Sequence, residues 1–357
     1  MPAKKAHVLL AAASVLAEDG EAIQAIAAEA GVAVEYVAVP EDGDGALTDA
    51  QCASITMVGV TPEMSGAQLD MEIYAQIQRM PLLELFSLPL VGTDWAWGAI
   101  DGLHEIYDRG CTLANSPGYN AIPVAQHAVA GLLALWARFP TYIANQRQRE
   151  WVNTVNDKKE LGEQIAVVFG FGSIGREIGR LLRAIGLRVV GVRRNVTMQP
   201  EDEGCVDELR PVAELPAALG GADWLLVTVP HTPETDQAVN AALLSAMPFG
   251  GGLVNVGRGA VVDEVAVDSA LRSGQLQSAY LDVFSVEPLP RSSPLWCDCI
   301  IFHQKMIIFH RKNIMFHQKV IIFYHFNHDR RRCGAIFHSF AVDFVSVDQL
   351  FFFIDLP

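Results

Sequence analysis

The chain lacks three features, each of which would define a class of protein. Its six cysteines are scattered over 357 residues, which predicts free thiols in a reducing compartment rather than a disulfide framework. It has 26 lysines and arginines against 41 aspartates and glutamates, and the formal net charge of −15 argues against a nucleic-acid or membrane partner. No apolar run reaches the roughly 18 residues needed to span a bilayer. We therefore expect a soluble, cytoplasmic protein.

Length and composition indicate two globular domains, because a chain of 357 residues that is 51% hydrophobic can build two cores. Two lysines before an apolar stretch imitate a signal peptide at the N-terminus. The pattern instead continues as a strand over residues 6–11, a helix near 21–31 and a strand over 32–39, which is the βαβ opening of a folded domain. This alternation predicts a separate α/β domain over residues 1–115.

A mononucleotide-binding unit begins with an apolar, β-branched run at Ile165–Phe169, which predicts a buried strand. Three glycines follow at G-x-G-x-x-G spacing. The first permits a tight turn, the second lets the backbone approach a pyrophosphate, and the third lets helix and strand pack closely. A glycine turn in some other α/β protein is the alternative, but the flanking strands and helix favour dinucleotide binding. The residues assigned to the coenzyme here are Gly170, Gly172, Ser173, Ile174 and Gly175.

Two arginines, Arg193 and Arg194, follow the second strand of this unit. An acidic residue at this place would bind the ribose 2'-hydroxyl of NAD, whereas guanidinium groups suit a 2'-phosphate. The sequence therefore favours NADP over NAD. The alternative is that both arginines are solvated surface charges.

A second domain is expected over residues 116–296. An apolar helical pattern over Ala121–Phe139, ended or bent by Pro140, bridges the two domains. The strands that follow alternate with helical segments and predict a doubly wound parallel sheet. They are expected near Ile165, Val189, Trp224–Val229, Gly252–Val256 and Ser278–Val283.

The composition changes abruptly over residues 297–357, where phenylalanine and histidine become frequent and near-identical heptads (IFHQKMI, IFHRKNI, MFHQKVI) follow one another from Ile301. A coiled coil would need clean a and d positions, and a zinc site would need other Cys and His spacings. The repeats favour instead a short tandem repeat in the coding DNA or a shifted reading frame. We expect this tail to be poorly structured.

Three further motifs lie downstream of the glycine turn: P-x-T-x-x-T in PHTPET, N-x-x-R-G-x-x-V-D-E in NVGRGAVVDE, and L-D-V-F-x-x-E-P in LDVFSVEP. Together they resemble the D-isomer-specific 2-hydroxyacid dehydrogenase family, over roughly Ala6–Trp296 and most clearly from Asn115 onward. The arginine pair is most similar to the NADP-preferring glyoxylate and hydroxypyruvate reductase branch. The resemblance implies an α/β fold with a Rossmann-type doubly wound sheet and a flavodoxin-like substrate domain. It also implies that the protein is a homodimer.

The resemblance also implies the catalytic roles. Hydride exchange with a 2-oxo or 2-hydroxy acid needs a cation for the carboxylate and a proton donor for the oxygen. Arg258 corresponds to the substrate-orienting arginine, and Glu287 to the glutamate that orients the catalytic histidine. The residues expected to line the coenzyme cleft are Val229, Pro230, Thr235, Val256, Gly257 and Asp282. Substrate is expected to contact Val58, Gly59, Val60 and Gly92 in the first domain, together with Arg258. No metal is expected.

The chain departs from the family pattern at the acid/base. The family has a T-P-H histidine about 19 residues after the glutamate, whereas position 306 here is Met306. His303 and His310 flank it within the repeat and are the candidate replacements. Because loss of a general acid/base costs roughly 10²- to 10⁴-fold in rate, a second hypothesis is a catalytically impaired NAD(P)-binding protein or a defective gene model.

Overall fold

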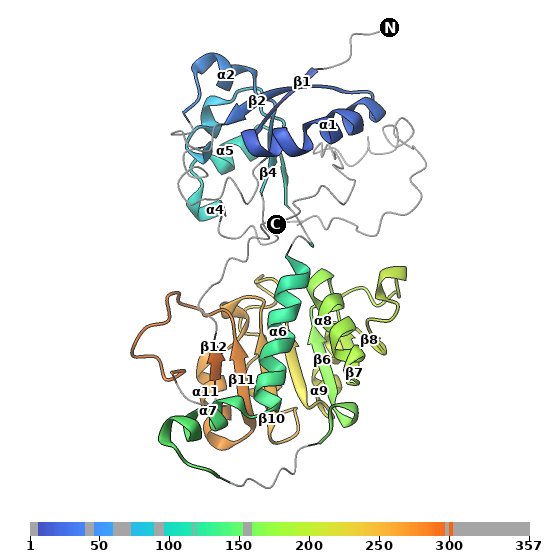
Figure 1. The fold of residues 1–357 in the computed structure, drawn as a ribbon, viewed down its shortest axis with the longest axis vertical. Helices are drawn as coiled ribbons and strands as arrows, with labels where there is room; N and C mark the ends of the chain where they lie inside the picture. Colours follow the sequence, from blue (N-terminus) through green and yellow to red (C-terminus); the bar gives the residue numbers. More distant parts are fainter. Residues whose placement is uncertain are drawn as a thin grey trace. The chain divides into compact units, whose positions relative to one another are not determined.

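The computed structural model describes residues 6–39, 46–59, 73–88, 96–115, 118, 120–152, 159–296 and 300–302. The chain divides between residues 119 and 120 into two compact units, each with one parallel sheet among its described residues (Figure 1). This confirms the expected α/β class.

The first unit has a five-stranded sheet in the order β2-β1-β3-β4-β5, which is the flavodoxin-like order 2-1-3-4-5. Its strands are β1 (Ala6–Ala12), β2 (Ala33–Val39), β3 (Met57–Gly59), β4 (Leu85–Ser87) and β5 (Thr112–Ala114). Its helices are α1 (Ala13–Glu29), α2 (Asp49–Ser54), η1 (Ile77–Arg79), α4 (Ala96–Ala99) and α5 (Leu103–Asp108). Helix α1 starts directly after β1, eight residues before the sequence predicted. The early start places Val15 in the core, where it is 5% exposed.

The second unit has a seven-stranded sheet in the order β12-β11-β10-β9-β6-β7-β8. Counted from β6 as the first strand, this is the Rossmann order 3-2-1-4-5-6 with one strand added at the β11 edge. The strands are β6 (Ile165–Phe169), β7 (Arg188–Val192), β8 (Glu208–Arg210), β9 (Trp224–Val227), β10 (Gly251–Asn255), β11 (Leu276–Leu281) and β12 (Ile300–Phe302). The five strands predicted from the sequence are all present, while β8 and β12 were missed.

The helical segments of the second unit cover both faces of this sheet. They are α6 (Ala121–Trp136), α7 (Phe139–Gln148), η2 (Leu161–Glu163), α8 (Ser173–Ala184), η3 (Pro200–Asp202), η4 (Val212–Glu214), α9 (Leu215–Leu219), α10 (Ala241–Leu244), η5 (Gly259–Val261) and α11 (Glu264–Ser273). The most regular amphipathic helix is α8, which buries Ile178 and Leu182.

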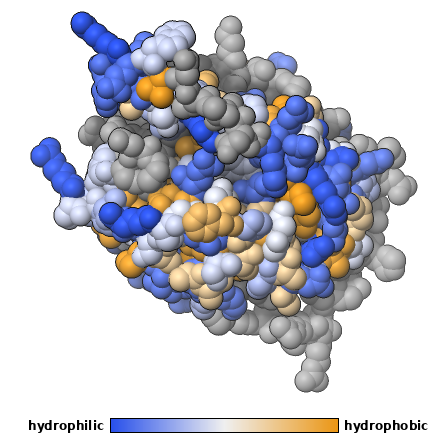
Figure 2. All heavy atoms as spheres, turned by 90° about the horizontal axis from the view of Figure 1, so that it is seen from below, coloured by the Kyte–Doolittle hydropathy of each residue, from blue (hydrophilic) through white to orange (hydrophobic). Residues whose placement is uncertain are grey.

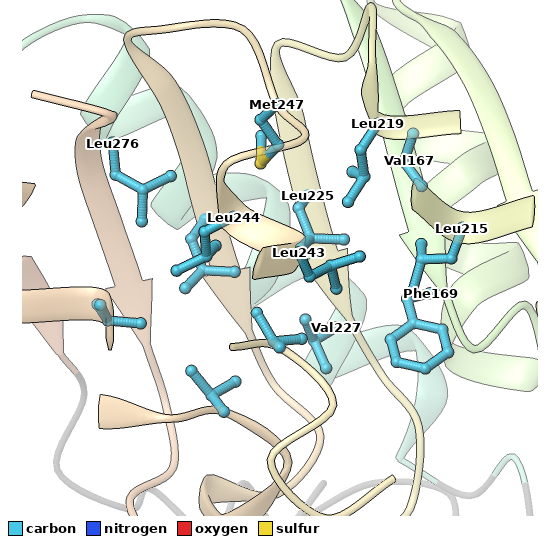
Figure 3. Close-up of a cluster of buried hydrophobic side chains, with 14 of the residues drawn as sticks. Val167, Phe169, Leu215, Leu219, Leu225, Val227, Leu243, Leu244, Met247 and Leu276 are labelled. Atoms are coloured by element: carbon cyan, nitrogen blue, oxygen red, sulfur yellow. The ribbon is translucent and has the colours of Figure 1, made fainter. Parts of the chain in front are cut away.

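Alternate residues of β9 enter two different cores, as the period of two in a strand requires. Trp224 and Leu226 pack with apolar residues of α6 and α8 on one face. Leu225 and Val227 pack with residues of α9, α10 and α11 on the other (Figure 3). Both faces of β9 are therefore buried, which explains why the run reads as continuously apolar.

The predicted bridging helix ends earlier than expected. Helix α6 stops at Trp136, Arg138 has a left-handed φ of 58°, and Pro140 lies in the first turn of α7. Proline is tolerated there because the first-turn N–H groups have no helical acceptor. No single helix among the described residues is long and apolar enough to cross a membrane. Helices α6 and α7 meet at a 59° bend, and only when taken together do they have the length and apolar composition of a membrane span.

The tail expected to be poorly structured includes one strand. Ile300, Ile301 and Phe302 form β12 and pair in parallel with Ala279, Tyr280 and Leu281 of β11. Three apolar residues suffice to extend a sheet edge in register. The remainder of the predicted tail, 297–299 and 303–357, lies outside the described residues.

Candidate coenzyme site and catalytic loops

The glycine turn after β6 is tightly packed against the loop after β9. Gly170 has a φ of +104°, and a Cβ there would lie 2.7 Å from the backbone N of Val229. A Cβ on Gly175 would lie 2.7 Å from the carbonyl O of Gly170. Thr228 Oγ1 donates a hydrogen bond to that same carbonyl at 2.5 Å. The first and third glycines thus have the structural roles that the motif predicts.

The second glycine faces open space. Gly172 is the N-cap residue of α8 without a side-chain cap, and a Cβ there would have no described atom within 4 Å. The first-turn N–H groups of Ser173 and Ile174 have no helical acceptor by geometry, and the positive end of the helix dipole lies here. A diphosphate fits this combination of uncapped donors and free space. Sequence reasoning predicted both features.

The loops after β9 and β10 form a wall beside the glycine turn. A Cβ on Gly257 would lie 2.7 Å from the carbonyl O of Val229, and Val256 donates its N–H to Val227 at 3.1 Å. Thr235 Oγ1 donates to the carbonyl of Pro230 at 2.7 Å and accepts from the N–H of Thr232 at 2.8 Å. The threonine therefore shapes the PHTPET turn, and all five predicted cleft residues in these two loops lie at the carboxyl edge of the sheet.

The two arginines after β7 differ in their contacts. Arg193 donates to both carboxylate oxygens of Asp202, at 3.0 Å to Oδ1 and 2.6 Å to Oδ2. It also donates to the backbone carbonyls of Asn195 and Thr197. Arg194, by contrast, has an exposed side chain. The expectation that both guanidinium groups grip a 2'-phosphate therefore does not match the contacts of Arg193.

Asp202 is a site residue that sequence reasoning missed. Its side chain is 0% exposed, and Arg176 of α8 also donates to it at 2.7 Å. Burial by itself would raise the pKa of Asp202, but the hydrogen bonds from Arg193 and Arg176 outweigh burial and lower that pKa. The only signal in the sequence is a short acidic turn (PEDEG), which does not distinguish Asp202 from its exposed neighbours.

A buried amide fixes the loop that carries Arg258. Asn255, the last residue of β10, is 1% exposed; its Oδ1 accepts from the N–H of Gly257 and its Nδ2 donates to the carbonyl of Arg258, both at 3.1 Å. Arg258 Nη1 donates to the carbonyl of Gly257 at 2.9 Å. Arg258 is therefore held at the carboxyl end of β10, the edge on which the glycine turn lies.

The loop that carries Glu287 is fixed to the Arg258 loop. The N–H of Ser285 donates to Glu264 Oε1 at 2.7 Å, and the N–H of Phe284 donates to Glu287 Oε1 at 3.1 Å. Gly259 lies against the backbone of Phe284 with no room for a side chain. The structure thus brings together the two motifs from which the catalytic residues were predicted.

Asp282 begins the same loop, and its N–H donates to the carbonyl of Asn255 at 2.9 Å. Burial, followed by the charge of Asp282, raises the pKa of the neighbouring Tyr280 to about 12. Asp282 therefore lies at the carboxyl edge of the sheet next to the Arg258 loop.

The remaining predicted residues lie elsewhere. Val58 and Gly59 belong to the end of β3 in the first unit, while Val60, Gly92, His303 and His310 lie outside the described residues. Within the part of the chain that the structure describes, no three His, Cys, Asp or Glu side chains are placed to hold a metal ion.

A parallel sheet of Rossmann order, with an uncapped helix behind a glycine turn, defines a dinucleotide-binding domain. Comparison with known proteins shows what this domain resembles. Residues 129–303 match the family model described as "D-isomer specific 2-hydroxyacid dehydrogenase, NAD binding domain". The second unit is therefore similar to the NAD-binding domain of the D-isomer specific 2-hydroxyacid dehydrogenases.

Individual relatives agree. The chain is 30% identical over 190 residues to a D-3-phosphoglycerate dehydrogenase from Synechocystis; these residues are 52% of this chain but only 32% of the relative's length. A D-isomer specific 2-hydroxyacid dehydrogenase from Xanthobacter autotrophicus, solved with NADPH and MES, has a TM-score of 0.60 and 29% identity, covering 83% of this chain and 86% of that one. An NADPH-dependent glyoxylate/hydroxypyruvate reductase from Sinorhizobium meliloti has the same fold (TM-score 0.60, 24% identity, covering 84% and 87%).

Proposed function

We propose that this chain is an NADP(H)-preferring oxidoreductase that interconverts a small 2-oxo acid and the matching D-2-hydroxy acid, of the glyoxylate or hydroxypyruvate type. The observation that carries the proposal is the position of Arg258. A buried amide, Asn255, holds the backbone of the Arg258 loop at the carboxyl edge of the sheet on which the glycine turn lies, and the guanidinium itself donates to the carbonyl of Gly257. In a doubly wound sheet, this edge is where the ligand binds.

The chemistry that a nicotinamide coenzyme supplies, when bound, is hydride transfer. The α8 N-terminus and Gly172 would hold its diphosphate, with Val229, Pro230, Val256 and Gly257 beside it. The charge of Arg258 would attract a substrate carboxylate and stabilise negative charge on the carbonyl oxygen as the carbonyl is reduced. Recognition of the carboxylate by a fixed guanidinium favours small 2-oxo acids over neutral carbonyl compounds.

The proposed proton donor is a histidine. Glu287 would orient an imidazole, and the two candidates are His303 and His310. In the sequence, His303 directly follows Phe302, the last residue of β12. A carboxylate that hydrogen-bonds a histidine orients the ring and favours its protonated form, as a general acid requires.

A second candidate function rests on a specific observation in the sequence. Met306 stands where the resemblance places the acid/base histidine. The chain would then be an NAD(P)-binding protein without turnover, acting as a sensor or representing an altered gene product. Both candidates need the coenzyme site, so they differ only in the chemical step.

NADP is proposed over NAD because basic residues follow β7 where an acidic residue would suit the NAD ribose. The Xanthobacter relative was solved with NADPH, which supports the same choice. The first unit, within residues 1–115, is proposed to bind the substrate, with Val58–Val60 and Gly92 near it, and residues 116–296 to bind the coenzyme.

The test uses the purified full-length chain. Titration with NADPH and NADH, followed by coenzyme fluorescence, measures binding, and loss of absorbance at the nicotinamide band on adding glyoxylate or hydroxypyruvate measures turnover. Binding with turnover supports the oxidoreductase, and His303→Ala and His310→Ala then identify the proton donor. Binding without turnover on any 2-oxo acid favours the second candidate. A folded chain that binds neither coenzyme contradicts both.

A further inference from the structure

A buried carboxylate, that of Asp202, pairs with the first of the two arginines that follow β7. Asp202, at the end of η3, is completely buried between two guanidinium groups, one from α8 and one from the end of β7. Arg176 donates to Oδ1, and Arg193 donates to both oxygens. The N–H of Gln199 supplies a further bond to Oδ2 at 2.8 Å. The carboxylate is thereby bonded to three different segments around the coenzyme site.

Arg193 uses its N–H donors in hydrogen bonds within the protein. Besides its two bonds to Asp202, Arg193 donates to three backbone carbonyls, those of Phe171, Asn195 and Thr197. Its side chain is only 14% exposed. A guanidinium has five N–H donors in a rigid fork, so a group bonded to this extent has little capacity left for a phosphate.

Arg194 has the opposite environment. It is exposed and lies next to Arg193 at the carboxyl end of β7, where the adenosine ribose of a dinucleotide is read. The pKa of Glu234 is lowered chiefly by a hydrogen bond from Thr232 and a backbone hydrogen bond. The positive charge of Arg194 lowers it further by a smaller amount. Its charge is therefore felt at the loop after β9, which carries Glu234.

We propose that Asp202 is a positioning residue that sets the coenzyme preference of this site. Because Asp202 binds the guanidinium of Arg193, recognition of a 2'-phosphate is left to Arg194. The inference rests on the proposed coenzyme binding and adds to it a residue and a division of tasks. Asp202 also offsets one of the two positive charges that flank it, those of Arg176 and Arg193. The preference for NADPH over NADH is accordingly smaller than two available arginines would give.

The experiment measures the ratio of the NADPH and NADH affinities in three variants of the full chain. Arg194→Gln is expected to lower the ratio by about tenfold or more, because one charge-assisted hydrogen bond to the phosphate is lost. Arg193→Gln is expected to lower it by much less. Asp202→Asn, which removes the negative charge and weakens the hold on Arg193, is expected to raise the ratio several-fold. A merely structural role of Asp202 would weaken both affinities and leave the ratio unchanged.

Asp207→Asn is the matched control. Asp207 also pairs with an arginine, Arg183, but its other bond is to the N–H of Val189 near the amino end of β7, away from the phosphate position. It should leave the ratio unchanged.

Three results overturn the inference: an Asp202→Asn ratio that is unchanged or lower, an Arg193→Gln effect as large as that of Arg194→Gln, or no effect of Arg194→Gln. The comparison of the two arginine variants decides the matter if Asp202→Asn does not fold. If the wild-type chain binds neither coenzyme, the proposed function itself fails. Binding of both coenzymes with an unaffected ratio refutes only the role of Asp202.

Discussion

Gly259 lies so close to Phe284 that a Cβ on the glycine would overlap the carbonyl carbon of the phenylalanine. This contact joins the Arg258 loop to the loop that carries Glu287, and hydrogen bonds from the N–H groups of Phe284 and Ser285 fix the second loop. The relative position of the two proposed catalytic residues therefore depends on a position where only glycine fits.

Gly259→Ala is expected to push the two loops apart. Overpacking of this kind costs about 1–3 kcal/mol of folding free energy, and misplacement of Arg258 should lower kcat/KM with a 2-oxo acid by roughly 10²-fold. Thermal unfolding and steady-state kinetics measure the two effects. Gly220→Ala is the control, because a Cβ there would meet its nearest neighbour at an ordinary 3.5 Å. Wild-type stability and kinetics in Gly259→Ala would show that the loops move independently.

The second and third glycines of the coenzyme turn should separate binding from stability. Gly172→Ala adds a methyl group in open space, so we expect unchanged unfolding but a loss of coenzyme affinity of at least about tenfold, since the methyl group occupies the diphosphate position. Gly175→Ala places a Cβ 2.7 Å from the Gly170 carbonyl and should lower both stability and affinity. Paired calorimetric titration and unfolding of each variant make the test. Full coenzyme affinity in Gly172→Ala would place the diphosphate elsewhere.

The sequence predicted the coenzyme turn well because its requirements are local. Spacing alone assigns Gly170, Gly172 and Gly175, and apolar runs assign the five largely buried strands β6, β7, β9, β10 and β11. Strand β8 is three residues long and half-exposed, with the charged pair Glu208 and Arg210, so it has no apolar signature.

The contacts of Arg193 could not be predicted, because they depend on tertiary structure. The partner, Asp202, is nine residues away in a turn whose neighbours are equally acidic. The sequence shows that an arginine carries a positive charge. Whether its guanidinium is available to a ligand depends on which carboxylate lies next to it in the fold. The same holds for Asn255, whose amide positions Arg258 only because the loop turns back over it.

Acid should destabilise the second unit through Asp202. The folded-state pKa of this carboxyl is lowered, so its ion pairs stabilise the protein above the unfolded-state pKa near 3.9, and this contribution is lost as the pH falls through the lower folded value. We expect Asp202→Asn to cost about 3 kcal/mol at pH 7, because two partly buried arginines lose their charged partner, and to unfold with a flatter pH dependence below about pH 4. Denaturant unfolding at a series of pH values measures both. Equal slopes for wild type and variant would exclude Asp202 as an acid-labile group.

Arg258 should affect turnover but not coenzyme binding. Arg258→Gln removes the charge that would hold the carboxylate and stabilise the carbonyl oxygen, so we expect kcat/KM to fall by about 10²- to 10³-fold. Arg258→Lys keeps the charge but cannot form two parallel bonds and should recover only part of the loss. The NADPH affinity should stay within about twofold of wild type in both. Arg272→Gln, at an arginine that pairs with Asp268 on the exposed side of α11, is the control. Equal activity of the Arg258 and Arg272 variants would refute the assignment.

Helix α7 should be part of the surface that joins two copies of the chain. It has no buried residue, yet Phe139 and Ile143 expose 54% and 46% of their surface. On the face drawn in Figure 2, hydrophobic residues are interspersed with hydrophilic ones. Large apolar side chains exposed together on one helix are a feature of surfaces that bind a partner.

In a dimer with two-fold symmetry, each substitution acts twice. Ile143→Asp is therefore expected to weaken association by at least about 30-fold, because a charge enters an apolar contact. Sedimentation equilibrium at micromolar concentration should show a wild-type dimer and a monomeric variant. Val265→Asp, at a residue of α11 that is 75% exposed, should leave the dimer intact. If wild type sediments as a monomer, or if the Ile143 and Val265 variants behave alike, α7 is not the interface, because the charge would then have entered a surface that nothing covers.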